Sequence, residues 1–362
     1  MSAATTSRAQ RTGAADPAAP VAVYGAYGHT GRFVVAELLR RGWTPRLCGR
    51  DGTQLQTLRA DFPDLEIAVA ATDDAAALDR ALAGAQAVIH CAGPFLDTGA
   101  PVLDAALRAG IGYFDVCAEQ AAVAAAYRRH DEAIAAGIVA VPAAAFYGGL
   151  ADLLASAACA DWSEADAIEI AVALDSWQPT LGTRLTGQRN QVPRWVIEDG
   201  REALVPTPPP QRDWRFQAPF GTQPMTLLPL SEVVTVSRHL SCRRLHSYMN
   251  LAPLQDLRDQ ATPPPRPADA SGRSAQRFAV EVLVRRGGEE RRARAQGRDI
   301  YAISAPLVVE TMEQALRGAG RGVIAPAQAG DAGAMLAALA VADPDFVVAV
   351  EAAARSAAGA EA

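Results

Sequence analysis

Lysine is missing from the sequence: the basic side chains of its 362 residues are arginine and histidine alone. This absence excludes a Schiff-base lysine, the lysine of a phosphate-binding P-loop and the Tyr/Lys catalytic pair of short-chain reductases. A composition rich in alanine and arginine is enough to explain why lysine is missing. The exclusion of lysine chemistry holds whatever the cause.

Metal-type cysteine patterns and long apolar runs are missing too. The five cysteines are scattered, without the CxxC or Cys/His spacing of metal sites, so we expect reduced thiols, a cytoplasmic protein and no bound metal. The net charge is −6 and both signs are mixed along the chain, which predicts no nucleic-acid partner. No apolar run is long enough to cross a bilayer, so no membrane partner is expected either.

The first 20 residues are mostly Ala, Ser, Thr and Arg. They lack the apolar core of a signal peptide, and we interpret residues 1–20 as a flexible tail. A transit peptide is the alternative that composition leaves open.

What the sequence does contain is an alternation of strand and helix patterns from Val21 to Pro142, in a chain long enough for two domains. Strands are predicted at 21–24, 45–49, 65–70, 87–91, 113–116 and 138–142, and helices at 33–41, 53–60, 75–82, 99–109 and 119–136. This order predicts an α/β fold, a Rossmann-type doubly wound parallel sheet, over residues 21–145. Ligands of such sheets bind beyond the carboxyl ends of the strands.

Three glycines occupy the turn between the first strand and the first helix. Spaced glycines occur in any tight turn, but a strand that feeds directly into a helix also aims free N–H groups and the helix dipole at one point, which suits a pyrophosphate. A Cβ in this turn would hold the phosphate off or clash with the strand beneath. We therefore predict cofactor contacts from the turn residues Gly25, Tyr27, Gly28, His29, Thr30 and Gly31.

The residue that follows the second strand indicates which dinucleotide binds. An acidic side chain there would hold a ribose 2′-hydroxyl, whereas an arginine accommodates a 2′-phosphate. Arg50 follows Gly49, and a guanidinium both grips phosphate and stacks on adenine, so NADP(H) is favoured. Asp51 would instead serve NAD. Asp73 is expected near the adenine, with a helix-capping role as the alternative.

Four segments together resemble a known family. They are the GAYGHTGR turn at 25–32, the Gly-Arg pair at 49–50, the AGPF segment at 92–95 with its later Gly-x-Pro-Val, and the Tyr-x-Asp-x-x-x-Glu segment at 113–119. The sequence is similar here to the saccharopine dehydrogenase-like oxidoreductases, including the short bacterial members described as trans-acting enoyl reductases. The match is strongest over 21–119 and weakens in the second domain, where 181–183 and 297–301 are similar.

The resemblance implies roles for particular positions. Ala92, Gly93, Pro94 and Phe95 would line the cofactor between pyrophosphate and nicotinamide, and Glu119 would lie near the nicotinamide ribose or the substrate. The family most often has glycine before that glutamate, whereas this chain has Ala118. Phe95 as plain core and Glu119 as the N-terminal acid of its helix are the structural alternatives.

Beyond residue 145 the pattern changes. β-prone segments at 167–174, 194–197, 232–236 and 278–285 follow without long helices between them. They predict an α+β domain over 146–299 built on an antiparallel sheet, which we expect to bind a small-molecule substrate and to form a homodimer. Proline-rich stretches at 206–210 and 263–267 are predicted surface loops.

The C-terminal region is expected to contain an amphipathic helix over 305–317 capped by Ser304, a second helix over 334–340 and a tail over 346–362. The resemblance implies that 300–345 packs back on the nucleotide domain.

Few side chains remain for acid chemistry. Tyr147 follows the sixth strand, so its hydroxyl is expected at the ligand edge, where it can donate a proton; it and Glu119 are the candidate catalytic residues. Thr183 and Arg184 are the candidate substrate contacts, since a guanidinium binds anionic groups. The hypothesis is an NADPH-dependent reductase of an enoyl C=C or an imine C=N. The alternatives are an NADP sensor without catalysis and an amino-acid dehydrogenase that acts on secondary amines.

Overall fold

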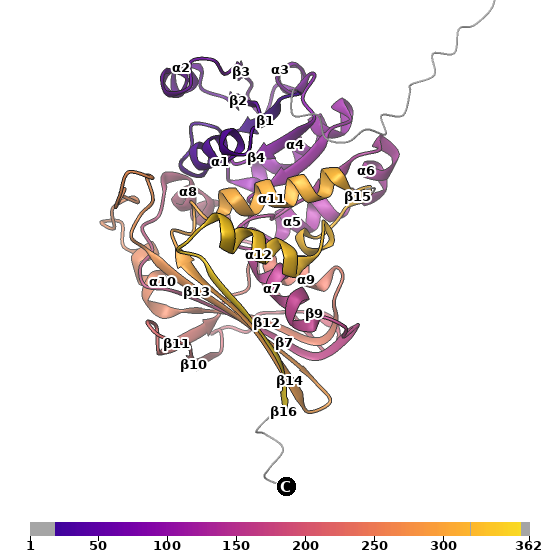
Figure 1. Cartoon of the computed structure of the whole chain (residues 1–362), viewed down its shortest axis with the longest axis vertical. Coiled ribbons are helices and arrows are strands. Elements are labelled where there is room, and N and C mark those ends of the chain that lie inside the picture. The colour runs from indigo at the N-terminus through magenta and orange to yellow at the C-terminus, as the bar shows by residue number, and fades with distance from the viewer. Residues whose placement is uncertain (1–18, 319, 356–362) are drawn as a thin grey trace, which may run out of the picture.

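The computed structural model describes residues 19–318 and 320–355. Figure 1 shows two sheets with helices between and around them, the N-terminal sheet at the top and a long, twisted sheet at the bottom. Of the tail expected over 1–20, all but residues 19 and 20 lies outside the described residues, as do 356–362.

The first sheet is parallel, with the strand order β15-β6-β5-β4-β1-β2-β3. Its strands are β1 (Val21–Tyr24), β2 (Pro45–Gly49), β3 (Ile67–Val69), β4 (Ala87–His90), β5 (Gly112–Asp115), β6 (Val139–Val141) and β15 (Gly322–Val323). Its helices are α1 (His29–Arg40), α2 (Gly52–Asp61), α3 (Ala75–Leu82), α4 (Phe95–Ala109), α5 (Gln120–Tyr127), α6 (His130–Ala136) and α11 (Ser304–Arg317).

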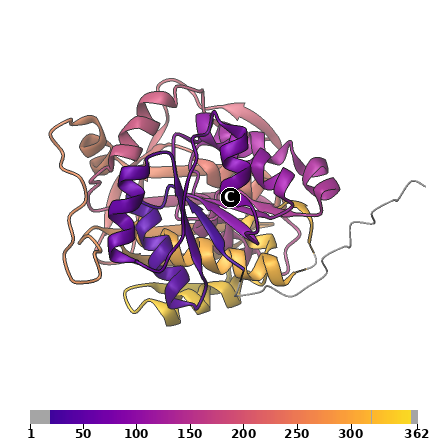
Figure 2. The ribbon, with the colours of Figure 1, turned by 90° about the horizontal axis from the view of Figure 1, so that it is seen from above.

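Alternate residues of β1 explain why helices cover both faces of this sheet. Val21 and Val23 pack with α1 and α11, while Ala22 and Tyr24 pack with α3 and α4. All four side chains are buried, as expected of a parallel strand covered on both sides. Figure 2 shows the indigo strands lying between two groups of helices. The predicted doubly wound α/β fold is confirmed.

The second sheet has the order β10-β11-β12-β7-β13-β14-β16, with the β8-β9 hairpin attached to β12. Its strands are β7 (Glu164–Leu174), β8 (Trp195–Glu198), β9 (Arg201–Leu204), β10 (Gln211–Arg215), β11 (Thr222–Leu227), β12 (Ser241–Asn250), β13 (Arg277–Arg286), β14 (Glu289–Arg298) and β16 (Val347–Arg355). Helices α7 (Gly149–Cys159), α8 (Leu181–Arg189), α9 (Ser231–Ser237), α10 (Leu251–Arg258) and α12 (Ala332–Ala342) and the 3₁₀ turn η1 (Pro326–Gln328) accompany it.

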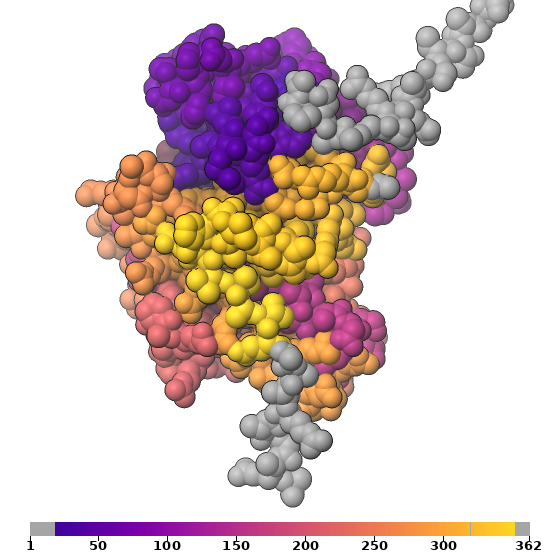
Figure 3. Space-filling model, viewed as in Figure 1, coloured from indigo at the N-terminus to yellow at the C-terminus, as the bar shows by residue number. Residues whose placement is uncertain are grey.

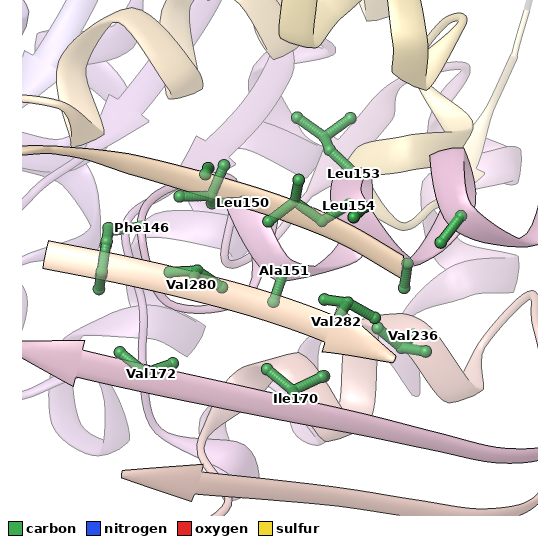
Figure 4. Close-up of a cluster of buried hydrophobic side chains, with 14 of the residues drawn as sticks. Phe146, Leu150, Ala151, Leu153, Leu154, Ile170, Val172, Val236, Val280 and Val282 are labelled. Atoms are coloured by element: carbon green, nitrogen blue, oxygen red, sulfur yellow. The ribbon is translucent and has the colours of Figure 1, made fainter. Parts of the chain in front are cut away.

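The core of this second domain lies between α7 and the sheet. Figure 4 shows Leu150 and Leu154 of α7 above Val280 of β13 and Ile170 of β7, all of them fully buried or nearly so. Burying each such side chain contributes about 1.5–3 kcal/mol. This packing holds the segment that follows β6, which carries Tyr147, in a fixed position.

The structure corrects several expectations for the second domain and its borders. The sheet is mixed and not purely antiparallel, because β12 pairs in parallel with β7. Residues 232–236, predicted as a strand, lie in helix α9, since the β preference of its valines and threonine yields to the burial of nearly every residue of that helix. The helix expected over 119–136 is broken at Arg128–Arg129 into α5 and α6, which brings the His130 ring against Val323 of β15.

The C-terminal region differs from its prediction in two places. Residues 347–355, expected within a tail, form β16 along β14, with an ion pair between Arg294 and Glu351. α12 packs on α7 and β16 of the second domain as well as on α11. α11 and β15 lie on the nucleotide domain, where Arg41 bonds to Glu310 and Glu313. Figure 3 shows this orange-to-yellow segment lying across the junction of the two domains.

Candidate functional site

A cavity of about 670 Å³ lies between the carboxyl edge of the parallel sheet and the second domain. The predicted site residues that line it are Thr30, Gly93, Phe95, Glu119, Tyr147, Thr183 and Arg184. Its size is ordinary for a small-molecule site. Both domains therefore contribute to one concave space at the edge where a doubly wound sheet binds its ligands.

The glycine turn is packed so closely against its own backbone and the loop after β4 that it has no space for side chains at Gly25 and Gly31. Gly25 has φ +87°, and a Cβ on Gly31 would lie 2.2 Å from the carbonyl oxygen of Gly25. Helix α1 begins at His29 after Gly28 and has no side-chain cap, so its first N–H groups face the open end of the turn. The turn thus has the geometry of a phosphate cradle.

Two further turn residues point toward different neighbours. The Tyr27 ring lies so close to Gly49 that a Cβ there would be 2.6 Å from its Cε1. The His29 ring stands edge-on to Phe33 and Tyr301, with centroids 5.3 and 5.2 Å apart. Burial lowers the pKa of His29, and its Nε2 has no partner among the described residues. The imidazole therefore faces the second domain.

The side chains expected near the adenosine are free to act there. Arg50 and Asp73 are exposed, and their charges act in opposite directions on the pKa of the Tyr24 phenol, which burial raises to about 12. Asp51 accepts hydrogen bonds from the N–H groups of Thr53 and Gln54. The alternative residue for NAD is thus used as the cap of α2, and Asp74, not Asp73, caps α3.

The 92–95 segment is held from two sides. Thr98 donates to the carbonyl of Ala92 at 2.6 Å, and the Gly93–Pro94 peptide is cis. On the other side, the Glu119 carboxylate accepts from the N–H of Phe95 at 2.8 Å. Burial raises the pKa of Glu119, while this hydrogen bond and that from Leu96 oppose the rise. Through these hydrogen bonds, Glu119 fixes the position of the start of α4, which forms part of the cavity wall.

The Tyr147 hydroxyl is a buried polar group in the wall of the cavity. It has no hydrogen-bond partner among the described residues, and the Tyr147 ring stacks on Trp177 with centroids 5.8 Å apart. Burial raises the pKa of Tyr147 well above its ordinary value, and Tyr301 and Glu232 raise it further. The phenol keeps its proton and is free to donate it in a hydrogen bond to a ligand.

The predicted substrate contacts lie on α8, next to Tyr301. The Thr183 hydroxyl is 2.9 Å from the Tyr301 hydroxyl, which also accepts from the Trp177 indole at 3.0 Å. Arg184 donates through Nη2 to the carbonyls of Asp259 and Thr262, while its Nη1 is buried and has no partner among residues 19–318 and 320–355. Arg189, on the same helix, pairs with Asp97 of α4, so α8 contacts both domains.

Sequence reasoning missed several residues of the site. Trp177, Tyr301 and Arg194 line the cavity, and the buried Gln120 ties Arg194's neighbour Trp195 to the first domain. Tyr301 falls inside the 297–301 stretch that carried part of the resemblance, so a motif could have found it. Arg194 has no local motif.

The described residues contain no group of three or more His, Cys, Asp or Glu that could hold a metal ion. In the same part of the chain, no helix is both long and apolar enough to cross a membrane.

Comparison with known proteins agrees with this geometry. Residues 21–141 match the family model for the saccharopine dehydrogenase NADP binding domain. A probable mitochondrial saccharopine dehydrogenase-like oxidoreductase of Arabidopsis thaliana is 33% identical over 119 residues, covering 29% of this chain and 26% of that protein. Residues 21–141 are thus similar to the NADP binding domain of the saccharopine dehydrogenases. The chain matches about a quarter of the length of that curated relative.

The fold extends this likeness to the whole molecule. Apo saccharopine dehydrogenase (L-Glu forming) of Saccharomyces cerevisiae superposes with a TM-score of 0.64 at 11% identity, covering 92% of this chain and 100% of that chain. At such low identity the superposition shows the fold alone. The expected α/β fold is confirmed, and the match over 21–141 supports the expected likeness to the saccharopine dehydrogenases and the expected NADP(H) cofactor.

Proposed function

We propose that this saccharopine dehydrogenase-like protein is an NADPH-dependent reductase that reduces an activated double bond of a small molecule, either an enoyl C=C conjugated to a carbonyl or an imine C=N. The observation that carries the proposal is the cavity into which the first domain brings Thr30, Gly93 and Phe95 and the second domain brings Tyr147 and Arg184. A cofactor on the carboxyl edge of the sheet and a substrate held by the second domain would meet there.

The residues present fit an NADP molecule. The cradle at Gly25 and Gly31 has no space for a Cβ, α1 begins without a side-chain cap, and Arg50 is exposed with Asp51 engaged elsewhere. These groups would hold the pyrophosphate and the 2′-phosphate. When bound, NADPH supplies the hydride; the protein supplies binding, orientation and electrostatics.

The roles of the two candidate catalytic residues differ. Tyr147, with its unpartnered hydroxyl in a buried site, would donate a hydrogen bond to the carbonyl oxygen or imine nitrogen and stabilise the charge that develops there. Glu119 acts as a positioning residue, because its carboxylate is bound to the N–H groups of Phe95 and Leu96. Thr183 would orient the substrate through Tyr301.

Two other functions are the alternatives to this proposal. A sensor that binds NADP without catalysis would have this side of the cofactor closed or lacking polar partners, and the free groups of Tyr147 and Arg184 argue against it. An amino-acid dehydrogenase that forms or cleaves a secondary amine needs a carboxylate-binding arginine in the cavity. Arg184 and Arg194 are available for that role.

Hydride-transfer assays test the proposal. Purified protein is mixed with NADPH and either enoyl thioesters or cyclic imines, and the loss of NADPH absorbance is followed. We expect turnover of one class. Tight NADPH binding with turnover of neither class would favour the sensor, whereas NADP⁺ reduction by secondary amino acids would favour the amino-acid dehydrogenase.

The homodimer and the cytoplasmic location stay predictions. Light scattering of the purified chain tests the first, and imaging of a tagged full-length chain in its own cell tests the second.

A further inference from the structure

One cation of the cavity has no partner in the described part of the chain. Arg194 lines the cavity, and its side chain forms neither a hydrogen bond nor an ion pair with the described residues. Burial lowers the pKa of Arg194, and the buried carboxylate of Glu232 partly offsets this. A half-buried guanidinium without a partner lowers the stability of the folded state, because it loses part of its hydration and gains no ion pair in return. The position of Arg194 therefore needs an explanation.

The other arginines in or beside the cavity are partly engaged or solvated. Arg184 donates through Nη2 to the carbonyl oxygens of Asp259 and Thr262, and its buried Nη1 stays without a partner in the described part of the chain. Arg258 is exposed, where water screens its charge. Arg189 belongs to an ion pair with Asp97 at 2.8 Å. Arg194 is therefore the cation best placed to gain from an anion of the ligand.

The backbone places Arg194 beside the cofactor edge. The buried side chain of Gln120 donates to the carbonyl of Trp195 at 2.8 Å and accepts from its N–H at 3.1 Å. This pair of bonds ties the start of β8 to the residue that follows Glu119. Arg194 consequently lies next to the loop after β5, which is part of the carboxyl edge of the parallel sheet.

Part of the cavity wall is apolar. Leu228, Leu230, Leu254 and Leu257 of the second domain line it together with Trp177 and Phe146, while Thr183, Gln188 and Gln191 are among its polar residues. The leucines offer a surface that binds hydrocarbon. The one carboxylate of the described lining, that of Glu119, is bound to N–H groups of α4.

We infer that the substrate is an amphiphilic acid: an apolar body with an anionic group, of which a carboxylate is the simplest form, bound by Arg194. The reducible double bond of this substrate rests on the proposed function. Its anionic group does not, because that part is inferred from Arg194 alone. The inference makes Arg194 the residue that determines specificity.

The test compares the binding of octanoate with that of its uncharged analogue octanamide. Binding is monitored by tryptophan fluorescence, because Trp177 lines the cavity. Titrations are run with and without saturating NADP⁺. The Kd of the unaltered protein for octanoate should be about 10- to 100-fold lower than its Kd for octanamide, because hydrogen bonds to a charged group contribute a free energy of that size. Arg194→Gln should bind the two compounds almost equally, and Arg194→Lys should keep part of the preference.

Arg201→Gln is the matched control, because it removes the same charge from an exposed position on β9. It should leave the preference unchanged. Equal binding of both compounds by the unaltered protein would overturn the inference, as would an Arg194→Gln protein that still prefers octanoate. If Arg194 serves only to offset Glu232, Arg194→Gln lowers the melting temperature, Glu232→Gln in the same chain restores it, and no octanoate preference exists at the start.

The failure of this inference is distinguishable from that of the proposed function. A protein that binds NADPH and reduces an acceptor but shows no octanoate preference loses only the inference. A protein that binds no NADPH loses the proposed function, while the titrations without cofactor still decide the role of Arg194.

Discussion

The carboxylate of Glu119 accepts hydrogen bonds from the backbone N–H groups of Phe95 at 2.8 Å and Leu96 at 3.4 Å. Glu119 ends the loop after β5, whereas Phe95 begins the helix after β4, so one side chain joins two neighbouring loops at the carboxyl edge of the sheet. The N-cap residue of α4 is Pro94, whose side chain cannot accept a hydrogen bond. Glu119 therefore supplies the acceptor for the first N–H groups of this helix. The shape of the cavity wall therefore depends on this contact.

Replacing Glu119 should affect both stability and cofactor binding. Glu119→Ala leaves the two N–H groups without their acceptor, and we expect a loss of about 0.5–2 kcal/mol in the free energy of unfolding, the range for a lost helix cap. NADPH affinity should fall as well, because the 92–95 segment loses the hydrogen bond from the Phe95 N–H to Glu119 that holds it in place. Chemical denaturation and NADPH titration measure the two effects.

Glu119→Gln serves as the partial replacement, since its amide oxygen still accepts one N–H bond. It should lie between the unaltered protein and Glu119→Ala. Glu164→Ala, at an exposed position on β7, is the control. An Ala variant of Glu119 with unchanged stability would mean that the contact contributes nothing.

Arg50 should decide between the two dinucleotides. The guanidinium is exposed after β2, and Asp51 is occupied as the cap of α2. Arg50→Ala removes a charge-assisted contact with the 2′-phosphate, so the Kd for NADPH should rise about 10- to 100-fold while that for NADH changes little. Fluorescence titration with both nucleotides measures the ratio. Arg59→Ala on the exposed side of α2 is the control, and equal losses for both nucleotides in Arg50→Ala would contradict the assignment.

The sequence alone predicted what is local in this site and missed what is not. The spacing of Gly25, Gly28 and Gly31 carries the cradle, because the strand, the turn and the helix that form it are consecutive in the chain. The bonds between Gln120 and Trp195 join residues 75 positions apart. No period or motif encodes such a contact, so Arg194 could not be placed at the cofactor edge before the fold was known.

The errors in the fold have in part the same physical origin. Val233, Val234 and Val236 favour a strand by local preference, yet they lie in α9, where burial against α7 and β12 outweighs the preference. The first half of β16 carries Val347, Val348 and Val350, whose local preference for a strand the expectation of a tail overlooked. The alanine-rich second half has little such preference and is extended because its backbone pairs with β14, which lies earlier in the chain.

His90 should make the stability of the fold depend on pH. Burial lowers the pKa of His90 from its ordinary 6.5 to about 3. Its ring accepts from the Ala92 N–H and lies 3.0 Å from the Thr98 hydroxyl, so the folded state holds it neutral. As the pH falls below 6.5, the unfolded chain takes up a proton that the folded chain refuses. The folded state should therefore lose about 1.4 kcal/mol per pH unit from this group.

The measurement is the difference between the unaltered protein and His90→Gln. Other buried groups titrate in the same range; burial raises the pKa of Asp115 to about 6, which acts in the opposite direction. The difference cancels their contributions. Denaturation from pH about 7.5 to about 5 should show His90→Gln losing stability less steeply than the unaltered protein, and parallel curves would show that His90 is not the titrating group.

Tyr147→Phe should separate catalysis from stability. The Tyr147 hydroxyl is buried without a partner among the described residues, and the removal of an unsatisfied buried group is neutral or stabilising. The melting temperature should therefore stay the same or rise, while kcat falls by about 10²- to 10⁴-fold if the phenol assists hydride transfer by donating to the acceptor. Tyr301→Phe is the contrasting variant: its hydroxyl bonds to Trp177 and Thr183, so its loss should lower the melting temperature. A Tyr147→Phe protein with full activity would remove the phenol from the chemistry and leave a backbone N–H or water as the proton donor.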